Sequence, residues 1–228
     1  MTAFASPNFG ERRGGVRPSL IVLHYTAMAS CAEARTRLCA PEHQVSAHWL
    51  ISENGHSEQL VDEAMRAWHA GSGRWAGLTD INSHSIGIEL ANTGFHPFPE
   101  PQMLVLEGLL TGIMARWAIP PAGFIAHSDM APGRKSDPGA RFDWRRLALA
   151  GLSIWPDTPG DGTRPLTDSL DRIGYPLVDP DSRLSAFRLR FRPQAQGPET
   201  AADRAMADAV ARLARTDQLP LATPVPLA

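Results

Sequence analysis

The sequence predicts an α/β fold, with a mixed central β-sheet flanked by helices and a small C-terminal three-helix bundle. Short apolar runs rich in β-branched residues, such as LIVLH at 20–24, are typical of buried strands. Segments with helical composition alternate with these runs up to about residue 155, as they do in α/β domains. A stretch dense in Pro, Gly and Asp follows, and three short helical segments lie beyond it.

The composition excludes several classes of protein. The chain has 228 residues, of which 43% are hydrophobic and 20% charged, with a formal net charge of -2. This balance is typical of a globular protein, because a disordered chain carries more charge and fewer large apolar residues. The near-neutral charge argues against nucleic acid as a partner. No apolar run approaches the roughly 18 residues of a membrane span. We expect a monomer.

The first elements follow from local patterns. The run 20–24 predicts a strand that ends at a histidine, and 30–38 has the composition of a helix. The run 45–51 predicts a second strand. Glu53-Asn54-Gly55 supplies turn chemistry before 56–61, which indicates a β-hairpin.

The next elements complete the first domain. The stretch 67–85 is rich in Gly, Trp, His and Asn without periodicity, so we expect a long ordered loop. The run 85–91 alternates like a strand, and 101–117 places leucines at helical spacing. A further strand is predicted at 123–127, followed by a Gly/Pro-rich loop and a closing helix at 142–149.

These patterns divide the chain into a catalytic domain at 17–155, a linker at 156–165 and a helical domain at 166–216. The helical domain contains three predicted helices, at 166–173, 183–191 and 200–215. Thr200-x-x-Asp203 predicts a capping box at the start of the last helix. About 50 residues make a marginal fold, so we expect this bundle to pack on the first domain. The tail from Leu219 is Pro-rich and predicted to fray.

Metal-competent residues stand at or just beyond the ends of two predicted strands. His24 follows LIVL, His127 follows GFIA, and Asp137 lies ten residues further on. Strand ends in α/β folds gather ligands. Two imidazoles and a carboxylate, with water in the fourth position, form the open site of a catalytic zinc, which lowers the pKa of the bound water. Glu89 projects from the face of its strand opposite Ile88 and is placed to accept the proton of that water.

Of the 22 basic residues, only Lys135 is a lysine. A chain that otherwise uses Arg keeps a compact ammonium where a planar guanidinium does not fit. Ligation of Asp137, two residues later, would hold this ammonium near the metal, where it could stabilise an oxyanion. The alternatives are a solvated loop charge for Lys135, a salt-bridge partner in the sheet for Glu89, and structural roles for the histidines.

Five motifs follow one another along the chain: LIVLHYTAM, VSAHWLISENG, AWHAGSGRWAG, NSHSIGIELANTG and AHSDMAPGRKSDPG. Together they resemble the zinc-dependent N-acetylmuramoyl-L-alanine amidases of the amidase_2 type, relatives of peptidoglycan recognition proteins. The resemblance covers most of the first domain. It implies His24, His127 and Asp137 as zinc ligands, Glu89 as the catalytic carboxylate and Lys135 as the stabiliser of the transition state.

The resemblance also implies the reaction. It is hydrolysis of the amide bond between N-acetylmuramic acid, or its 1,6-anhydro form, and L-alanine in peptidoglycan or its fragments. The alternative is a recognition protein that binds muropeptides without cutting them, and the intact Asp137 favours the enzyme. We expect His69 and Trp75 to line the substrate groove, and Asn92, which follows the catalytic strand, to be a third substrate-binding residue. His69 is either a neighbour of the metal site or a hydrogen-bonding loop residue.

The C-terminal segment resembles a peptidoglycan-binding three-helix module, on the motifs LDRIGYPL and LSAFRLRFRP. That module usually carries Gln and His where this chain has Arg188 and Arg190. Its usual Gly-x-x-Asp-x-x-Thr pattern is replaced by Gly197-x-x-Thr200-x-x-Asp203. Wall binding and a structural role as a docked bundle both remain open. The arginines, with Arg192, either meet an anionic polymer or form a solvated helix face.

Two further features concern the compartment. The first 19 residues lack the apolar region of a secretory signal, which predicts a cytoplasmic protein. The C-terminal module instead favours the periplasm or cell envelope. Two cysteines are too few for a disulfide scaffold. Cys31 and Cys39 are either two thiols or a local bridge in an oxidising compartment.

Overall fold

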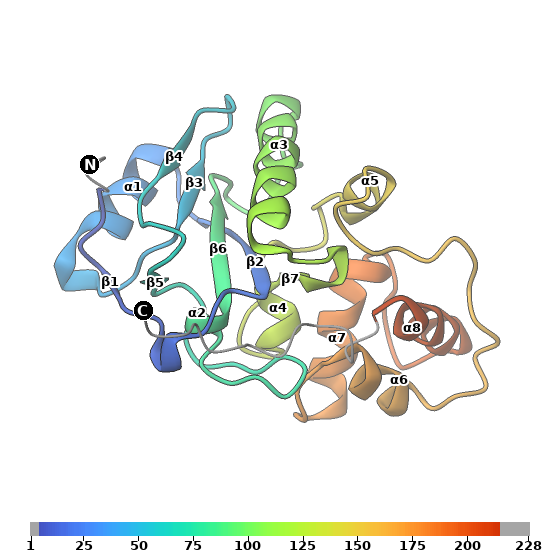
Figure 1. The fold of residues 1–228 in the computed structure, drawn as a ribbon. Helices are drawn as coiled ribbons and strands as arrows, with labels where there is room; N and C mark the ends of the chain where they lie inside the picture. Colours follow the sequence, from blue (N-terminus) through green and yellow to red (C-terminus); the bar gives the residue numbers. More distant parts are fainter. Residues whose placement is uncertain (1–4, 215–228) are drawn as a thin grey trace.

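The computed structural model describes residues 5–214 of the chain. A five-stranded sheet in the order β4-β3-β6-β2-β7 forms its centre (Figure 1). The neighbours β3 and β6, β6 and β2, and β2 and β7 are parallel, whereas β4 pairs with β3 antiparallel. The predicted mixed sheet is therefore confirmed. Its strands are β2 (Leu20–Tyr25), β3 (Trp49–Ile51), β4 (Ser57–Gln59), β6 (Ser85–Leu90) and β7 (Phe124–Ala126).

The predicted helices are present. They are α1 (Cys31–Cys39), α3 (Glu100–Trp117), α5 (Trp144–Leu149), α6 (Leu166–Ile173), α7 (Pro180–Phe191) and α8 (Ala201–Ala214). Local chemistry explains two boundaries. The Ser30 hydroxyl caps α1 by accepting the N–H of Glu33 at 3.2 Å. Gly55 closes the β3–β4 hairpin with a φ of 86°, a conformation that glycine adopts without strain. The last predicted helical residue, at 215, and the tail from Leu219 lie outside the described residues.

The structure also contains short elements that the sequence patterns did not indicate. The expected loop at 67–85 includes the single-turn helix α2 (Ile81–His84), and α4 (His127–Met130) follows directly on β7. Two-residue strands β1 (Phe9–Gly10) and β5 (Arg66–Ala67) pair antiparallel. These four elements have only two to four residues each, too few to show a hydrophobic period in the sequence.

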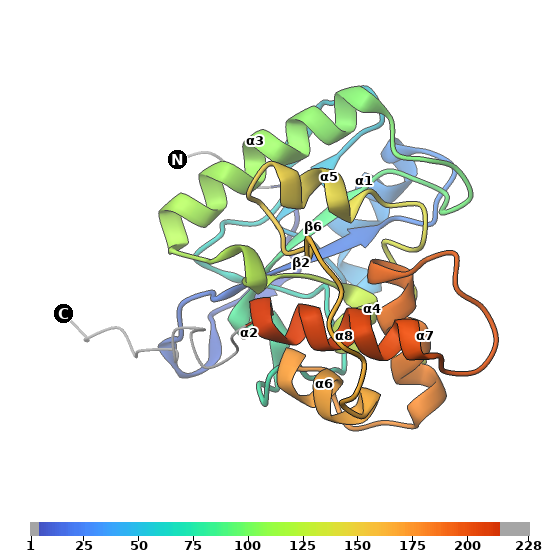
Figure 2. The same cartoon turned by 90° about the vertical axis from the view of Figure 1, so that its right-hand side faces the viewer.

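The two faces of the sheet are covered differently. Ile21 and Leu23 of β2 pack with α3 and α5 in one core cluster. Leu20 and Val22 point to the opposite face and share a second cluster with the C-terminal helices. Figure 2 shows α3 and α5 on one side of β2 and β6, and α6 and α8 on the other. On this second face α1 covers β3, where Leu38 packs against Leu50 in a third cluster.

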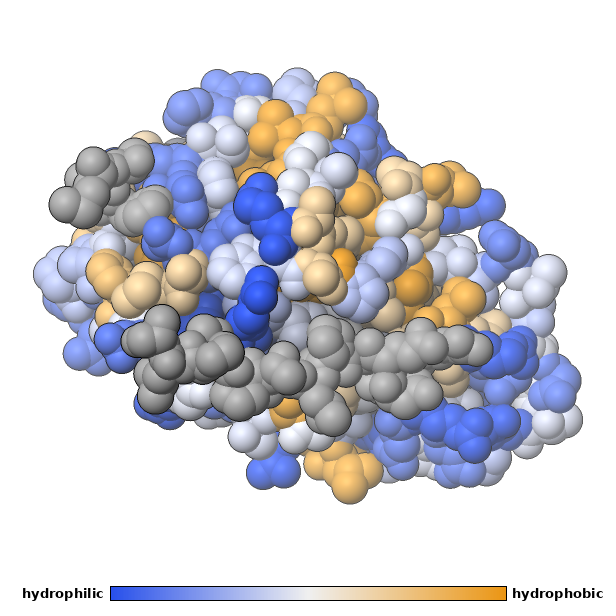
Figure 3. Space-filling model, in the orientation of Figure 1, coloured by the Kyte–Doolittle hydropathy of each residue, from blue (hydrophilic) through white to orange (hydrophobic). Residues whose placement is uncertain are grey.

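The C-terminal helices are thus a docked bundle that shares a core with the sheet. Leu170, Phe187 and Val210 of the three helices join Leu20 and the other sheet residues of the second cluster. Hydrophilic side chains gather over the outer surface of the bundle, at the lower right of Figure 3. The predicted linker packs against the C-terminal helices, since the N–H of Gly160 donates to the carbonyl of Ala205 in α8 at 2.8 Å.

Neither reading of the arginines in α7 is correct for Arg188 and Arg190. Both side chains are buried, so they face neither a polymer nor solvent. Arg188 donates to Asp203 at 2.6 Å, and Arg190 donates to Asp129 at 2.7 Å. Arg192 also pairs with Asp203. Arg188 and Arg190 therefore neutralise carboxylates that are buried inside the protein.

The capping box at the start of α8 is confirmed. The Thr200 N–H donates to the Asp203 carboxylate at 2.8 Å, and the Asp203 N–H approaches the Thr200 hydroxyl at 3.4 Å.

A bridge between Cys31 and Cys39 is excluded by the fold. The two thiols are free and stand at opposite ends of α1. Eight residues of helix separate their Cα atoms by about 12 Å, whereas a disulfide requires less than about 7 Å. Among the helices of residues 5–214, none has the length and apolar character needed to cross a bilayer.

Candidate active site

The predicted chemical residues meet on the sheet face that carries α1 and the C-terminal helices. His24 is the next-to-last residue of β2 and lies opposite Glu89 of β6 in the parallel register, so the two side chains project side by side. His127 begins α4 directly after β7, the other neighbour of β2. Asp137 is held close by because its carbonyl accepts the N–H of Ser128 at 3.0 Å.

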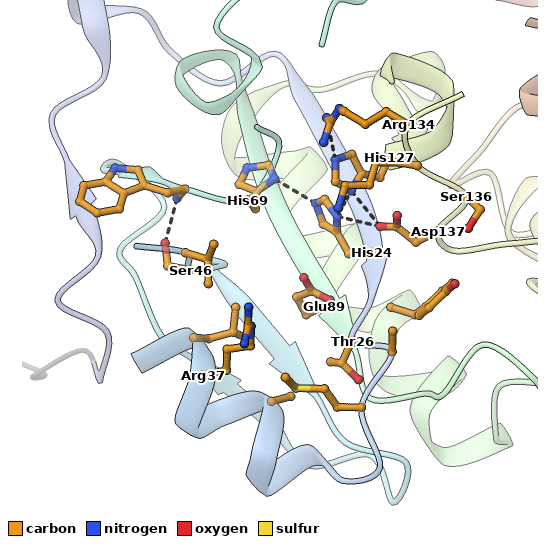
Figure 4. Close-up of a pocket in the computed structure, with 18 residues that line it drawn as sticks. His24, Thr26, Arg37, Ser46, His69, Glu89, His127, Arg134, Ser136 and Asp137 are labelled. Atoms are coloured by element: carbon orange, nitrogen blue, oxygen red, sulfur yellow. Dashed lines mark hydrogen bonds and ion pairs between the residues drawn. The ribbon is translucent and has the colours of Figure 1, made fainter. Parts of the chain in front are cut away.

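Three potential ligand atoms converge at one point (Figure 4). Nδ1 of His24 lies 2.9 Å from Nδ1 of His127 and 3.0 Å from Oδ2 of Asp137, and the remaining separation is 2.9 Å. Three corners of a tetrahedron around an ion with bonds near 2.05 Å are separated by about 3.3 Å. The triangle is close to that size. His24, His127 and Asp137 are therefore positioned for a metal.

The outward-facing ring atoms of both histidines also have partners. Nε2 of His127 donates to the carbonyl of Ala70 at 2.9 Å, and Nε2 of His24 lies 3.0 Å from Nδ1 of His69. Metal-binding histidines usually make such a second hydrogen bond, because it fixes the ring and leaves the other nitrogen free. The donor set thus fits an open two-histidine, one-carboxylate site.

Burial sets the protonation of the cluster. Desolvation, followed by the nearby His127, lowers the pKa of His24 to about 4, so its ring is neutral at neutral pH as a ligand must be. Burial alone would raise the pKa of Asp137. The close contacts of its Oδ2 with His127 and His24 outweigh this effect and hold that pKa below its usual value. Asp137 therefore supplies the one anionic ligand.

Glu89 has the opposite electrostatics. Desolvation and then the charge of Asp137 raise its pKa well above the usual value, and Lys135 opposes the shift. One of its carboxylate oxygens, Oε2, is buried and makes no hydrogen bond within residues 5–214. A buried carboxylate without a partner is costly to retain. Its neighbourhood suits a group that exchanges a proton with something bound beside it.

A cavity of about 410 Å³ opens over this cluster. Its floor holds the three ligand residues and Glu89, and its rim includes the exposed Lys135. The remaining wall comes largely from α1 and the loops beside it, with Met28, Arg37, Leu38, Val45 and Trp68. The cavity therefore combines apolar walls with convergent polar groups, as small-molecule sites usually do.

The structure separates the three predicted substrate-groove residues. His69 lines the cavity. Trp75 does not: it is buried in the core, with its ring 5.1 Å from that of Tyr175 at the contact with the C-terminal bundle. Asn92 is also buried, and its side-chain oxygen accepts the N–H of Gly94 at 2.7 Å. Trp75 and Asn92 therefore have structural roles. The Trp75 indole packs in the core, and the Asn92 amide stabilises a turn.

Sequence reasoning missed other residues of the cavity wall. Trp68 stands beside His69 in the AWHAG motif, so that motif was a usable signal. Arg37 and Arg134 gave no signal in a chain so rich in arginine. Arg134 donates to the Ala70 carbonyl at 2.8 Å, the same oxygen that receives the His127 ring proton.

Comparison with known proteins agrees with this geometry. A family model described as N-acetylmuramoyl-L-alanine amidase matches residues 14–140. The N-acetylmuramoyl-L-alanine amidase AmiD of Escherichia coli (strain K12) is 37% identical over 232 residues, which covers 85% of this chain and 82% of that protein. The 1,6-anhydro-N-acetylmuramyl-L-alanine amidase AmpD of Haemophilus influenzae is 34% identical over 159 residues, 62% of this chain and 86% of that protein.

Solved structures extend the likeness to the C-terminal helices. E. coli AmiD, in complex with anhydro-N-acetylmuramic acid-L-Ala-D-gamma-Glu-L-Lys, has a TM-score of 0.77 at 33% identity and covers 93% of this chain and 92% of that one. AmpDh3 of Pseudomonas aeruginosa has a TM-score of 0.79 at 30% identity, covering 93% and 98%. A structure of AmpD covers only 65% of this chain and 92% of that one, with a TM-score of 0.57 at 29% identity. The match to residues 14–140 and the identity with AmiD place this chain in the Amidase_2 family of N-acetylmuramoyl-L-alanine amidases.

Proposed function

We propose that this protein is a zinc-dependent N-acetylmuramoyl-L-alanine amidase. It hydrolyses the amide bond between the lactyl group of N-acetylmuramic acid, or its 1,6-anhydro form, and the L-alanine of the stem peptide. The observation that carries the proposal is the convergence of two imidazole nitrogens and one carboxylate oxygen, within 3.0 Å of one another, on the floor of a cavity.

The donor set supports zinc among the common metals. Two histidines and one carboxylate with an open fourth position form a frequent catalytic zinc site. A zinc ion held by His24, His127 and Asp137 supplies Lewis acidity, which lowers the pKa of water and polarises a carbonyl.

The chain's own residues carry the proton transfers. Glu89 accepts a proton from the attacking water, and its raised pKa suits it to return a proton to the departing amine of L-alanine. The ammonium of Lys135, on the rim of the same cavity, faces the oxyanion that develops on the lactyl carbonyl.

We further propose soluble 1,6-anhydro-muropeptides as the substrate. AmiD and AmpDh3 have been solved in complexes described with an anhydro-N-acetylmuramic acid peptide and an anhydromuramic pentapeptide. The buried ion pairs of Arg188 and Arg190 favour a structural role for the C-terminal bundle over wall binding. Fractionation of the producing cells decides between the cytoplasm and the cell envelope.

The test is mass spectrometry of the products released by the purified chain, with and without a chelator. Intact sacculi and soluble anhydro-muropeptides are supplied in parallel. We expect chelator-sensitive release of free stem peptides from the soluble fragments. Equal or faster release from sacculi would contradict the proposed soluble substrate. Binding of muropeptides without any release would establish a recognition protein instead.

A further inference from the structure

His69 lies directly behind His24, on the side of that ring away from Asp137 (Figure 4). Its Nδ1 is 3.0 Å from Nε2 of His24, and the two rings meet nearly edge-on, at an interplanar angle of 79°. Its other nitrogen, Nε2, lies 3.2 Å from the hydroxyl of Ser85, and that hydroxyl lies 2.6 Å from the carbonyl oxygen of Ile81. Four groups therefore form one continuous chain of hydrogen bonds that ends on the backbone.

The direction of each bond in this chain follows from its last member. A carbonyl oxygen only accepts, so the single proton of the Ser85 hydroxyl is donated to Ile81. The Ser85 oxygen must then accept from Nε2 of His69. Nδ1 of the same neutral ring is left without a proton and accepts from Nε2 of His24.

We propose that His69 is a positioning residue for the metal site. Resting on the proposed zinc-dependent function, its role is to hold the proton of His24 on Nε2, so that Nδ1 presents a lone pair to the metal. Without an acceptor at this place, the neutral His24 ring is free to carry its proton on Nδ1, where it would compete with the metal.

Neighbouring residues also fix the backbone of His69 and Ala70. The Asn82 side chain accepts the N–H groups of both His69 and Ala70, at 3.0 and 2.8 Å. The Ala70 carbonyl in turn receives the ring proton of His127 at 2.9 Å. Two adjacent residues therefore orient both imidazole ligands, one through its side chain and the other through its backbone.

Gly87 makes room for the His69 ring on β6. A Cβ at this position would lie 2.4 Å from Cγ of His69, which is too close for any real contact. Gly87 has no positive φ, so alanine is conformationally acceptable there, and the three atoms nearest to an added Cβ all belong to the His69 ring. Substitution of Gly87 is therefore a second, independent way to displace the His69 ring.

The experiment measures Zn²⁺ affinity of the full-length chain by competition with a chromogenic chelator. We expect His69→Leu, which removes the acceptor, to weaken zinc binding about 10- to 100-fold. His69→Gln retains both an acceptor and a donor and should recover most of the affinity. The exposed His56 provides a matched control. His56→Ala leaves the hydrogen-bond chain behind His24 intact, and this variant should bind zinc like the wild type.

Two further readouts separate positioning from general stability. In ¹⁵N-histidine NMR spectra of the metal-free protein, His24 should carry its proton on Nε2 in the wild type and populate both tautomers in His69→Leu. Gly87→Ala should weaken zinc binding to a similar extent, while thermal unfolding and circular dichroism show whether the fold is retained.

The outcomes distinguish this inference from the function on which it rests. Failure of the wild-type chain to bind zinc would overturn the proposed function, and the positioning role with it. Tight zinc binding by the wild type and equally tight binding by His69→Leu would overturn the positioning role alone. An unchanged His24 tautomer in His69→Leu would do the same.

Discussion

The carboxyl group of Glu89 is the side chain whose surroundings bear most directly on the reaction. It stands beside His24 in the strand register, its pKa is raised by burial, and its Oε2 makes no hydrogen bond within residues 5–214. A structural carboxylate would have found a cation among the many arginines of this chain, as Asp129 and Asp203 have done. The missing partner therefore favours a catalytic role for Glu89.

Replacing Glu89 tests this role. Glu89→Gln keeps the shape of the side chain but removes proton transfer, so turnover should fall about 10²- to 10⁴-fold. Zinc content, measured by elemental analysis, should not change, because Glu89 is not a ligand. The exposed Glu42→Gln serves as the control. Turnover near the wild-type level in Glu89→Gln would rule out the proposed role.

Lys135 gives a second prediction at the residue scale. If a compact ammonium faces the oxyanion, Lys135→Arg preserves the charge but misplaces it, and turnover should fall about 10²- to 10³-fold with zinc retained. The measurement is the initial rate of stem-peptide release. Arg145→Lys, the converse exchange at an exposed position of α5, should have no effect. A fully active Lys135→Arg variant would show that only the charge matters, or that Lys135 is a solvated residue.

At the scale of elements, strand β6 shows how one alternating pattern serves two faces. Its isoleucines pack under α3, while Ser85, Gly87 and Glu89 point to the face of the metal site. The sequence alternation identified Glu89 but gave no role to Ser85 and Gly87. Their roles depend on His69, which lies in the loop between β5 and α2 and packs against both residues.

The junction of α7 and α8 predicts a pH dependence of stability. Burial alone would raise the pKa of Asp203, but the hydrogen bonds from Arg188, Thr200 and Arg192 outweigh it and hold that pKa below its usual value. A lowered pKa means that the ionised carboxylate stabilises the fold above about pH 4. This contribution is lost as the pH falls through the lowered pKa of the folded state.

Urea unfolding of the metal-free protein at pH 7 and pH 3 measures this contribution. The difference in free energy of unfolding between the wild type and Asp203→Asn should be large at pH 7 and smaller at pH 3. The exposed Asp168→Asn should show little difference from the wild type at either pH. A pH-independent difference for Asp203→Asn would show that its charge does not contribute.

For the whole molecule, the decisive feature is the contact between the bundle and the first domain. Arg190 of α7 donates to Asp129 at 2.7 Å and to the carbonyl of Phe124 at 3.0 Å, and its guanidinium lies 4.2 Å from the Trp144 ring centroid. Tyr175 donates to the same aspartate at 2.7 Å. Asp129 also accepts the N–H of Ala126, immediately before His127, so the bundle braces the segment that carries a metal ligand.

Breaking this contact should be costly. Arg190→Met leaves Asp129 buried without its cation, which typically costs about 3 to 5 kcal/mol of the free energy of unfolding. Arg212→Met is the matched control, because the Arg212 side chain is 57% exposed and its buried partner Asp208 also pairs with Arg164. Loss of such a solvent-exposed arginine should cost no more than about 1 kcal/mol. Equal unfolding midpoints in urea for the two variants would show that the bundle is not braced in this way.

Much of the architecture was predictable because it depends on local patterns. The apolar runs predicted the strands, and composition and helical spacing predicted the helices. The polar residues near or just beyond the ends of β2 and β7 predicted the metal ligands. The one-turn helices α2 and α4 and the two-residue strands β1 and β5 escaped prediction, because segments this short show no hydrophobic period. The division of roles among His69, Trp75 and Asn92 escaped it as well, because a histidine, an indole and an amide serve binding or packing equally until their neighbours are known.

The sequence by itself determined the order of the elements, the residues that could bind a metal, and the family resemblance. Only the tertiary structure decided which arginines are buried, that the bundle shares a core with the sheet, and that His69 stands behind His24. The physical reason is that ligand atoms at strand ends are brought together by a register that local patterns encode. Partners such as Arg190 and Asp129 lie 61 residues apart, and only packing of the whole chain brings them into contact.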